Sequence, residues 1–345
     1  MSERDRLHVL HVTDCLNAGV GKIVRQIVSK NYGETNSLLW DSHIDSPATE
    51  FDDSVDLYST QRWRKGFLRR ALHLRRVVKL NNPQIVHAHS SFAGFYVRLF
   101  IHGRIKVYSP HCFSFDRLDI TSAKRIFYYL VEQILHLFTS HYVVNWPIEA
   151  IQVSKFLPKK NIYFLASETT LFNDEKRITS SRVQQCPIFI AVGRIRPQKD
   201  PSFFAAIAKE FNQISNGIFI WIGEGDEALM NELEIAGVTV IPWLEISEVT
   251  KYYERATATI ITSRWESGPL TLFESLNSHT PVILRNTKSS RLYGVEVFES
   301  VSDAVHECLR ISNMEFTDTI VEDQRRKCKA ALESILERPY ISAFS

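Results

Sequence analysis

The sequence lacks any apolar run close to the roughly 20 residues that a membrane-spanning helix needs. Its first residues also lack the apolar core of a secretion signal, so we expect a cytoplasmic protein. Cysteine is scarce: the five residues are scattered and form no C-x-x-C pair. This spacing predicts reduced thiols and argues against both a disulfide framework and a cysteine-based zinc site.

The chain has little net charge, but its charge is unevenly distributed. Its 345 residues are enough for two domains, each with its own core. Residues 1–170 contain 22 Lys and Arg against 15 Asp and Glu, whereas the remainder contains 19 against 24. We therefore expect the first half to meet an anionic partner. A nucleic acid is disfavoured, because no binding motif accompanies the charge.

The basic charge is concentrated in residues 61–79, which include eight basic residues and no acid. Leu68, Leu72 and Val78 can share one face of a helix in this segment. Two interpretations remain open: a solvated helix whose apolar face packs on the core, or an amphipathic helix attracted to anionic lipid. In the second interpretation the lipid contacts are Arg69, Arg70, Arg75 and Arg76.

Short apolar segments alternate with helical ones along the whole chain, which predicts α/β domains with parallel sheets. The predicted strands cover residues 7–13, 37–41, 84–89, 107–109, 142–144, 161–164, 188–192, 218–222, 238–241 and 258–261. Residues 166–186 are polar and lack apolar periodicity, which is typical of a linker. We therefore expect a first domain over 1–165 and a second over 187–320.

The most informative stretch is residues 260–276, I-I-T-S-R-W-E-S-G-P-L-T-L-F-E-S-L. It predicts a strand, a Gly-Pro break and a new helix, with Pro269 in the first helical turn. The main chain of Ser267, Gly268, Pro269 and Leu270 would then form a seat for a diphosphate at a helix N-terminus. Two carboxylates, Glu266 and Glu274, bracket this seat and can accept hydrogen bonds from sugar hydroxyls.

Two other loops follow predicted strands and carry residues suited to phosphate. Arg194 and Lys199 come after strand 188–192 and place two positive charges where a diphosphate would depart. Gly19 and Gly21 come after strand 7–13, in a loop where backbone can approach a phosphate or sugar closely.

These motifs together resemble the retaining GT-B glycosyltransferases of family 4, the group 1 enzymes of bacterial polysaccharide assembly. The resemblance rests on E-x7-E across a strand, a Gly-Pro turn and a helix, and on V-G-R-I-R-P-Q-K-D at 192–200. It also rests on N-P-Q-I-V-H-A-H-S-S-F-A-G from residue 82 and P-H-C-F-S-F from residue 110. The sequence departs from the family at residues 284–287, where relatives have a glycine-rich turn.

The resemblance implies a GT-B fold, α/β with two Rossmann-like domains facing across a cleft, and a C-terminal helix over 321–345 that crosses back to the first domain. It implies hexose transfer from a UDP- or GDP-linked sugar, with Arg194 and Lys199 stabilising the leaving diphosphate. Glu274 would hold the ribose hydroxyls, Glu266 the sugar's own hydroxyls, and His111 would support the sugar from the other domain.

Some assignments stay open at this stage. Trp243 either covers the nucleobase or packs, and Asp116 is either an acceptor-side carboxylate or a turn residue. No D-x-D motif occurs, so we expect neither a metal nor a cofactor. The expected acceptor is a lipid-linked saccharide, met at the inner face of an anionic membrane to which the enzyme is peripheral. The alternatives are a non-hydrolysing sugar-nucleotide epimerase and a catalytically silent, membrane-recruited nucleotide-sugar binding module.

Overall fold

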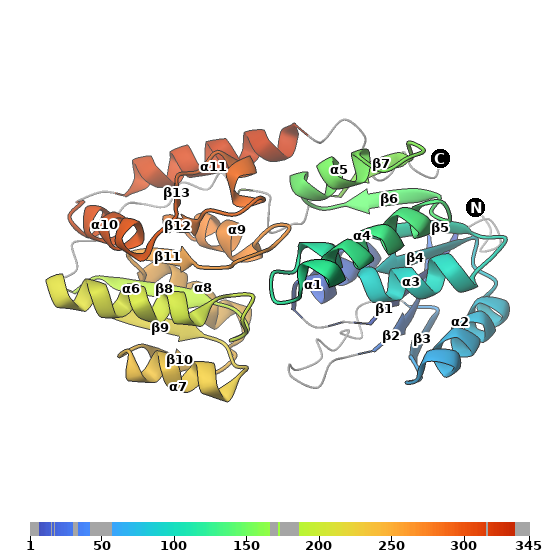
Figure 1. The fold of residues 1–345 in the computed structure, drawn as a ribbon, viewed down its shortest axis with the longest axis horizontal. Helices are drawn as coiled ribbons and strands as arrows, with labels where there is room; N and C mark the ends of the chain where they lie inside the picture. Colours follow the sequence, from blue (N-terminus) through green and yellow to red (C-terminus); the bar gives the residue numbers. More distant parts are fainter. Residues whose placement is uncertain are drawn as a thin grey trace. The chain divides into compact units, whose positions relative to one another are not determined.

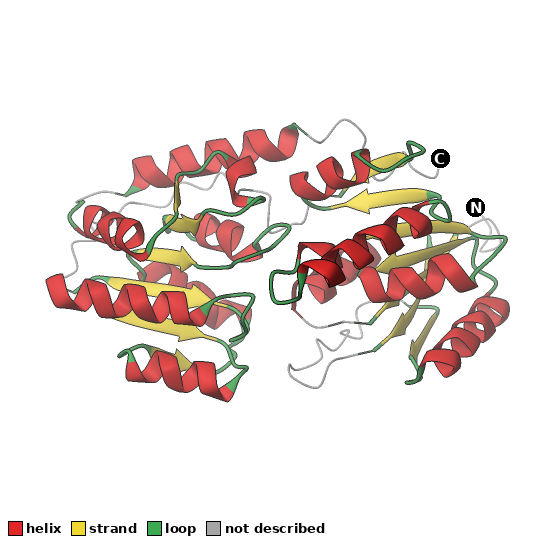
Figure 2. Cartoon of the chain, in the orientation of Figure 1, coloured by secondary structure: helices red, strands yellow, loops and turns green. Residues whose placement is uncertain are grey.

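The structure is a computed structural model that describes residues 7–14, 16, 18–29, 34–41, 57–165, 172, 186–314 and 317–334. These residues form two α/β units, one within residues 1–167 and one within residues 168–334 (Figures 1 and 2). The predicted linker at 166–186 falls almost wholly outside the described residues. No described helix combines the length and apolar content needed to cross a membrane.

The first unit contains a parallel sheet with the strand order β3-β2-β1-β4-β5-β6-β7. Its strands are β1 (His8–Thr13), β2 (Thr35–Trp40), β3 (Ser59–Arg62), β4 (Ile85–His89), β5 (Ile105–Ser109), β6 (His141–Val144) and β7 (Asn161–Phe164). Its helices are α1 (Ala18–Ser29), α2 (Phe67–Asn81), α3 (Ser91–Phe100), α4 (Ser122–His136) and α5 (Pro147–Ser154), with the short η2 (Ser114–Asp116). The central strand β4 is buried along its whole length, as expected for a parallel sheet covered on both faces.

Three details of the first unit differ from the sequence predictions. Residues 59–62 form an edge strand where we expected loop, because a short polar edge strand has little apolar signal. Helix α2 begins only at Phe67, after Gly66, whose φ of 96° is not helical. Helix α1 begins at Ala18, so Gly19 and Gly21 lie in its first turns and not in a loop. Their predicted role at the donor remains a prediction.

The basic helix α2 also differs from the sequence prediction, because some of the side chains expected at its surface are buried. Leu68 and Leu72 are exposed, whereas Val78 packs in the core, so the whole face does not pack on the core, and its attraction to anionic lipid stays a prediction. Arg70 is not available for lipid: it donates to Asp41 over 2.6 Å, and its side chain is only 13% exposed. Arg69, Arg75 and Arg76 are exposed.

The second unit contains a parallel sheet with the order β10-β9-β8-β11-β12-β13. Its strands are β8 (Ile188–Val192), β9 (Ile218–Ile222), β10 (Thr239–Ile241), β11 (Ala258–Ile261), β12 (Val282–Arg285) and β13 (Val297–Phe298). Its helices are α6 (Pro201–Ile214), α7 (Glu227–Ile235), α8 (Ile246–Arg255), α9 (Leu270–Asn277), η4 (Ser290–Tyr293), α10 (Val301–Ser312) and α11 (Asp318–Glu333). An aromatic core around Phe189, Phe204, Phe211, Phe219 and Trp221 fills the space between the sheet and α6.

The C-terminal helix α11 packs within the second unit, against α9 and η4. The side chain of Gln324 fixes it there, because its amide accepts from the Val282 N–H over 3.0 Å and donates to the Val282 carbonyl over 2.8 Å. Of the predicted crossing helix over 321–345, residues 321–333 lie in α11 within the second unit and residues 335–345 lie outside the described residues, so the return to the first domain stays a prediction.

Each sheet has one point where the strand order reverses. The chain goes to one side from β1 to β2 and to the other from β1 to β4, and likewise from β8 to β9 and from β8 to β11. Loops at the carboxyl ends of the two strands diverge at such a point and leave room for a ligand. Among the predicted site residues, Arg194 and Lys199 follow β8, residues 266–270 follow β11, and Gly19 and Gly21 follow β1.

Candidate functional site

In the second unit, two loops meet at the carboxyl ends of β8 and β11. Three hydrogen bonds tie residues 198–199 to residues 262–265. Thr262 Oγ1 donates to the Lys199 carbonyl over 2.6 Å, the Arg264 N–H donates to the Gln198 carbonyl over 2.9 Å, and Gln198 Nε2 donates to the Trp265 carbonyl over 3.0 Å. The V-G-R-I-R-P-Q-K-D motif and the start of the E-x7-E motif therefore form one local structure.

The charged side chains of this structure are in direct contact. Lys199 Nζ forms an ion pair with Glu266 Oε1, and Ser263 Oγ donates to the same oxygen over 2.5 Å. The side chain of Lys199 is 23% exposed and that of Glu266 10%, so the pair is largely buried and Lys199 is its more accessible member. An incoming phosphate would add a second anion beside Lys199, which is the arrangement that a basic clamp needs.

The backbone of the first loop depends on glycine. Gly193 has φ 146°, and a Cβ atom there would lie 3.0 Å from Cε of Lys199. Gly223, at the end of β9, packs so closely that a Cβ atom would meet the Gly193 carbonyl oxygen at 2.2 Å. These contacts require glycine at both positions. Arg194 follows Gly193 and is half-buried; its contact with a diphosphate remains a prediction.

Helix α9 starts directly after the second loop, as predicted, but Pro269 occupies the N-cap and not the first turn. Proline has no N–H, so Pro269 shapes the seat without donating to an anion. The amides of Ser267, Gly268 and Leu270 remain the predicted donors. The Ser267 hydroxyl is buried and has no hydrogen-bond partner among the described residues.

Glu274 is oriented by a hydrogen bond from a buried tyrosine that the sequence analysis did not predict. Tyr253 OH donates to Glu274 Oε2 over 3.1 Å. Burial and the adjacent carboxylate raise the pKa of Tyr253 well above its usual value, so the phenol remains a donor. Glu274 therefore has one oxygen held by the protein.

Arg285 links the loops from the end of β12, at the position where the sequence departs from the family. Its Nη1 donates to Asp200 Oδ2 over 2.5 Å and to the Thr262 carbonyl over 3.1 Å. Its guanidinium also stacks over the Phe203 ring at 4.1 Å. Nothing in the local sequence pairs residue 285 with residue 200, so this contact could not be predicted from spacing.

Trp243 lies after β10, with its ring next to Gly223. Its indole Nε1 is buried and has no hydrogen-bond partner among the described residues. The structure therefore leaves both interpretations of Trp243 open.

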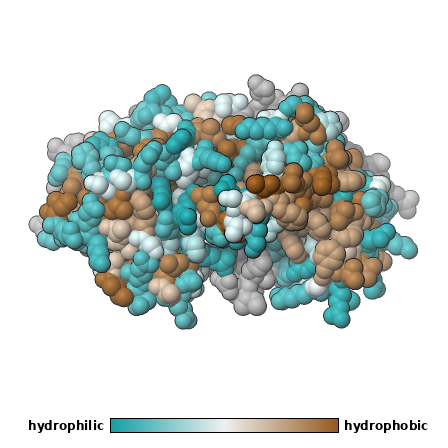
Figure 3. Space-filling view, viewed as in Figure 1, coloured by the Kyte–Doolittle hydropathy of each residue, from teal (hydrophilic) through white to brown (hydrophobic). Residues whose placement is uncertain are grey.

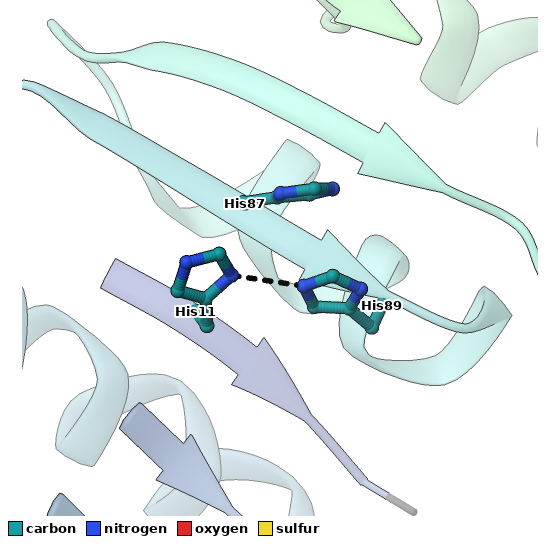
Figure 4. A group of neighbouring side chains, drawn as sticks. All are labelled: His11, His87 and His89. Atoms are coloured by element: carbon teal, nitrogen blue, oxygen red, sulfur yellow. Dashed lines mark hydrogen bonds between the residues drawn. The ribbon is translucent and has the colours of Figure 1, made fainter. Parts of the chain in front are cut away.

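In the first unit, three buried histidines lie side by side on the paired strands β1 and β4 (Figure 4). His11 Nε2 lies 3.1 Å from Asn36 Oδ1, an oxygen that can only accept, so His11 carries its proton on Nε2. His11 Nδ1 then accepts from His89 Nε2 at 3.0 Å, and His89 Nδ1 accepts from His111 Nε2 at 3.1 Å. The three rings thus form one hydrogen-bonded row that begins at Asn36.

Burial keeps these imidazoles neutral. Desolvation lowers the pKa of His11 to about 4 and that of His111 to about 4, and a hydrogen bond to Asn36 or to Asn145, respectively, acts against the shift. The pKa of His89 is also well below its usual value. His87 bonds within the sheet, since its Nε2 lies 2.9 Å from Ser109 Oγ. His89, however, connects the sheet interior to His111.

A metal ion is the other chemistry that this cluster suggests. Ligand atoms of His11, His87 and His89 all lie within 4.8 Å of one another. Both ring nitrogens of His11 are already in hydrogen bonds, however, so the ring would have to leave Asn36 or His89 to bind a metal. Our prediction that the protein needs no metal stays a prediction.

His111 projects from a strained turn after β5. Its φ is 49° and that of Cys112 is 97°, an uncommon conformation for two successive side-chain-bearing residues. The buried carboxylate of Glu149 accepts from the Cys112 N–H over 3.2 Å and from the Asn145 N–H over 2.9 Å, which holds the turn. Asp116 accepts two bonds from Gln152 Nε2, at 2.9 and 2.7 Å, so its carboxylate is engaged within the fold.

Comparison with known proteins finds a family domain in the second unit and related proteins over most of the chain. The family model of the glycosyl transferases group 1 matches residues 172–293, the part that contains both motifs of the second unit. An uncharacterized 41.2 kDa protein in the cps region of Klebsiella pneumoniae is 28% identical over 305 residues, which is 82% of each chain. The UDP-Gal:alpha-D-GlcNAc-diphosphoundecaprenol alpha-1,3-galactosyltransferase of Escherichia coli is 25% identical over 282 residues, 70% of this chain and 69% of that protein.

Solved structures give the same result at the level of the fold. Sucrose-phosphate synthase from Thermosynechococcus elongatus aligns with a TM-score of 0.73 at 15% identity and covers 96% of each chain. Anabaena HepE, solved with UDP and glucose, aligns with a TM-score of 0.70 at 13% identity over 96% of this chain and 98% of its own. The predicted α/β fold class and GT-B fold are thus confirmed, and the chain contains a glycosyl transferases group 1 domain over residues 172–293.

Proposed function

We propose that this glycosyltransferase moves a hexose, with retention of configuration, from a nucleotide diphosphate sugar to a hydroxyl of a lipid-linked saccharide in cell-surface polysaccharide biosynthesis. The donor class is supported by the contact between Lys199 and Glu266 beside the start of α9. A fixed cation and a carboxylate 67 residues apart are brought together where phosphate and sugar of one donor would lie. This juxtaposition is the observation that carries the proposal.

Each group has a task in the proposed transfer. Lys199 and Arg194 stabilise the negative charge that develops on the departing diphosphate, together with the amides at the start of α9. Glu266 accepts hydrogen bonds from the sugar's hydroxyls, and Glu274 accepts from the ribose. His111 supports the sugar, and its Nε2 lies 3.1 Å from His89 Nδ1. An oxygen of the departing diphosphate takes the proton of the acceptor hydroxyl. No protein nucleophile is assigned.

The acceptor and the location of the enzyme are inferred from the relatives and from charge. The Escherichia coli relative is named for a GlcNAc-diphosphoundecaprenol acceptor, and the Klebsiella relative lies in a cps region. We extend to this chain a lipid-linked saccharide acceptor and a peripheral position at the inner face of the membrane. A donor of the UDP class is favoured because that relative and HepE are both named with UDP.

The test is thermal stabilisation of the purified protein by a panel of nucleoside diphosphates and sugar nucleotides, with EDTA present. A ligand that binds only the folded state raises its stability by mass action. We expect one base to give the largest shift, and Lys199→Ala to reduce it strongly. Lys209→Ala is the matched control, because Lys209 is an exposed lysine on α6 of the same unit.

Product analysis separates transfer from epimerisation. We expect the best donor to be consumed only when a saccharide acceptor is present and to yield a nucleoside diphosphate. Conversion of the sugar nucleotide without acceptor would assign an epimerase, whereas binding with neither reaction would assign a silent binding module. A requirement for an added divalent ion after EDTA would contradict the metal-free proposal.

A further inference from the structure

Helix α4 of the first unit buries polar side chains and exposes apolar ones, the reverse of an ordinary surface helix. Its buried residues are Glu132, Leu135 and His136. Its outward face carries a continuous apolar stripe that continues just beyond the helix end. Side chains of this stripe are between 42% and 61% exposed: Ile126, Phe127, Leu130, Ile134, Leu137 and Phe138.

The polar inner face is firmly held, so the exposure of the stripe is built into the fold. Arg98 of α3 pairs with Glu132 through two bonds, of 2.7 and 3.1 Å, with both side chains buried. His136 lies 2.9 Å from Tyr142 OH and 2.6 Å from the Pro158 carbonyl. Turning the stripe inward would break all of these interactions and leave a buried charge unpaired, which is strongly unfavourable.

The stripe belongs to a larger apolar surface over α2, α3 and α4, which Figure 3 shows as brown side chains gathered over this part of the molecule. Exposed apolar side chains on α2 and α3 extend it: Phe67, Leu68, Leu72, Leu80, Phe92 and Leu99. In the second unit, by contrast, the exposed large apolar residues that the structure describes are single isoleucines on four elements: Ile214, Ile218, Ile235 and Ile246. Contiguous patches mark interaction sites, whereas scattered residues do not.

Charge decides between possible occupants of this surface. Residues 57–115, which include α2 and α3, contain eleven Lys and Arg and no Asp or Glu. The one acid of α4, Glu132, is buried in its ion pair. The outer surface of the three helices is therefore apolar and basic, without a carboxylate. A second copy of this surface would repel it, whereas an anionic bilayer offers both an apolar interior and negative headgroups.

We propose that the outward face of α4 inserts into the interface of an anionic membrane, with Arg69, Arg75 and Arg76 of α2 contacting headgroups at its side. This rests on the proposed function for its biological setting, since it would bring the enzyme to a lipid-linked acceptor. It goes beyond the attraction expected from the basic helix, because it assigns the apolar insertion to a different element.

Flotation with vesicles of phosphatidylcholine and phosphatidylglycerol tests the proposal. The α4 variant replaces three side chains, Phe127→Ser, Leu130→Gln and Ile134→Gln. We expect its partition onto these vesicles to fall by about tenfold or more, since each replaced side chain loses its burial in lipid. The matched control is Ile214→Gln, Ile235→Gln and Ile246→Gln in the second unit, and it should float like the unmodified protein.

A second variant, with Arg69→Gln, Arg75→Gln and Arg76→Gln, should lose affinity by about fivefold per charge at low ionic strength and should bind with less dependence on salt. Stabilisation by nucleoside diphosphates should be unchanged in every variant, which shows that the fold and the donor site are intact. If nucleoside diphosphates did not stabilise the unmodified protein, the proposed function would be contradicted. The vesicle experiment could still be interpreted, because it measures membrane binding by itself.

Two results would overturn the proposal. One is flotation of the α4 variant to the same extent as the unmodified protein. The other is a dimer in light scattering that the α4 substitutions dissociate, with no vesicle binding by the unmodified chain, which would assign this surface to a second copy.

Discussion

At the scale of single residues, the second unit holds its carboxylates in two different ways. Glu266 is neutralised by Lys199 and bonded to Ser263, so it is part of a charged pair before any ligand arrives. Glu274 instead receives a neutral bond from the buried Tyr253. A carboxylate oxygen can accept more than one hydrogen bond, so Glu274 retains the capacity to accept from a pair of hydroxyls.

This difference leads to a prediction for Glu274. If it holds the ribose, Glu274→Ala will weaken binding of the preferred nucleoside diphosphate by about 10- to 150-fold, the effect of losing hydrogen bonds to a charged group. The same substitution will change the affinity for the 2′,3′-dideoxy form by less than about twofold, because that form has no hydroxyls to lose. Calorimetry with both ligands measures the two effects. Glu234→Ala, an exposed glutamate of α7, is the control, and equal losses for both ligands would refute the ribose assignment.

Candidate site residues that belong to a motif could be predicted from the sequence. Their hydrogen-bond and ion-pair partners could not. The motifs gave Lys199, Glu266 and Glu274, because strand ends of a parallel sheet carry the site. Tyr253 and Arg285 were missed because they reach the site from other elements, and their contacts depend on packing. Arg70 was misassigned for the same reason: a basic residue in a basic helix gives no sign that Asp41 lies within 2.6 Å.

At the scale of elements, the sheet of the first unit is unusual because it buries titratable side chains, which costs free energy. Strands β1 and β4 place His11, His87 and His89 in the interior, where they are neutral and bonded to one another or to neighbouring side chains. The alternation of strands and helices was predictable from apolar patterns, and most strands were found. The histidine chain was not, because it needs the register that sets His11 opposite His87 and next to His89.

These histidines predict acid sensitivity of the first unit. The pKa of His11 is lowered to about 4 in the folded state, against 6.5 for the unperturbed group. Between these values the unfolded chain binds more protons than the folded chain, so the free energy of unfolding falls as the pH drops from about 6.5 to 4. His11 alone contributes up to about 3 kcal/mol of this loss, and His87 and His89 shift in the same direction.

Hydrogen exchange at pH 7.5 and 5, corrected for the intrinsic rate, measures this effect strand by strand. We expect peptides from β1 and β4 to lose protection at the lower pH. Peptides from β8 and β9 are the internal control, because neither strand contains a histidine. Equal loss in both sheets would mean that the acid-labile groups lie elsewhere.

At the scale of the whole molecule, each unit provides a different part of the proposed chemistry. The second unit has the cation, the helix start and the two glutamates that would hold a nucleotide diphosphate and sugar. The first has His111 on a strained turn and the apolar, basic surface of α2, α3 and α4. Nucleotide and sugar should therefore affect the two units unequally.

The last prediction follows from this division. A nucleoside diphosphate should increase hydrogen-exchange protection in the loops after β8 and β11, while the turn at His111 and Cys112 stays as it was. The matching sugar nucleotide should protect those loops and also the His111 turn, because only the sugar would reach that histidine. His111→Ala should abolish the additional protection and leave the nucleotide effect intact. If the sugar nucleotide and the nucleoside diphosphate gave the same pattern, His111 would have no contact with the donor sugar, and its role would have to be sought with the acceptor.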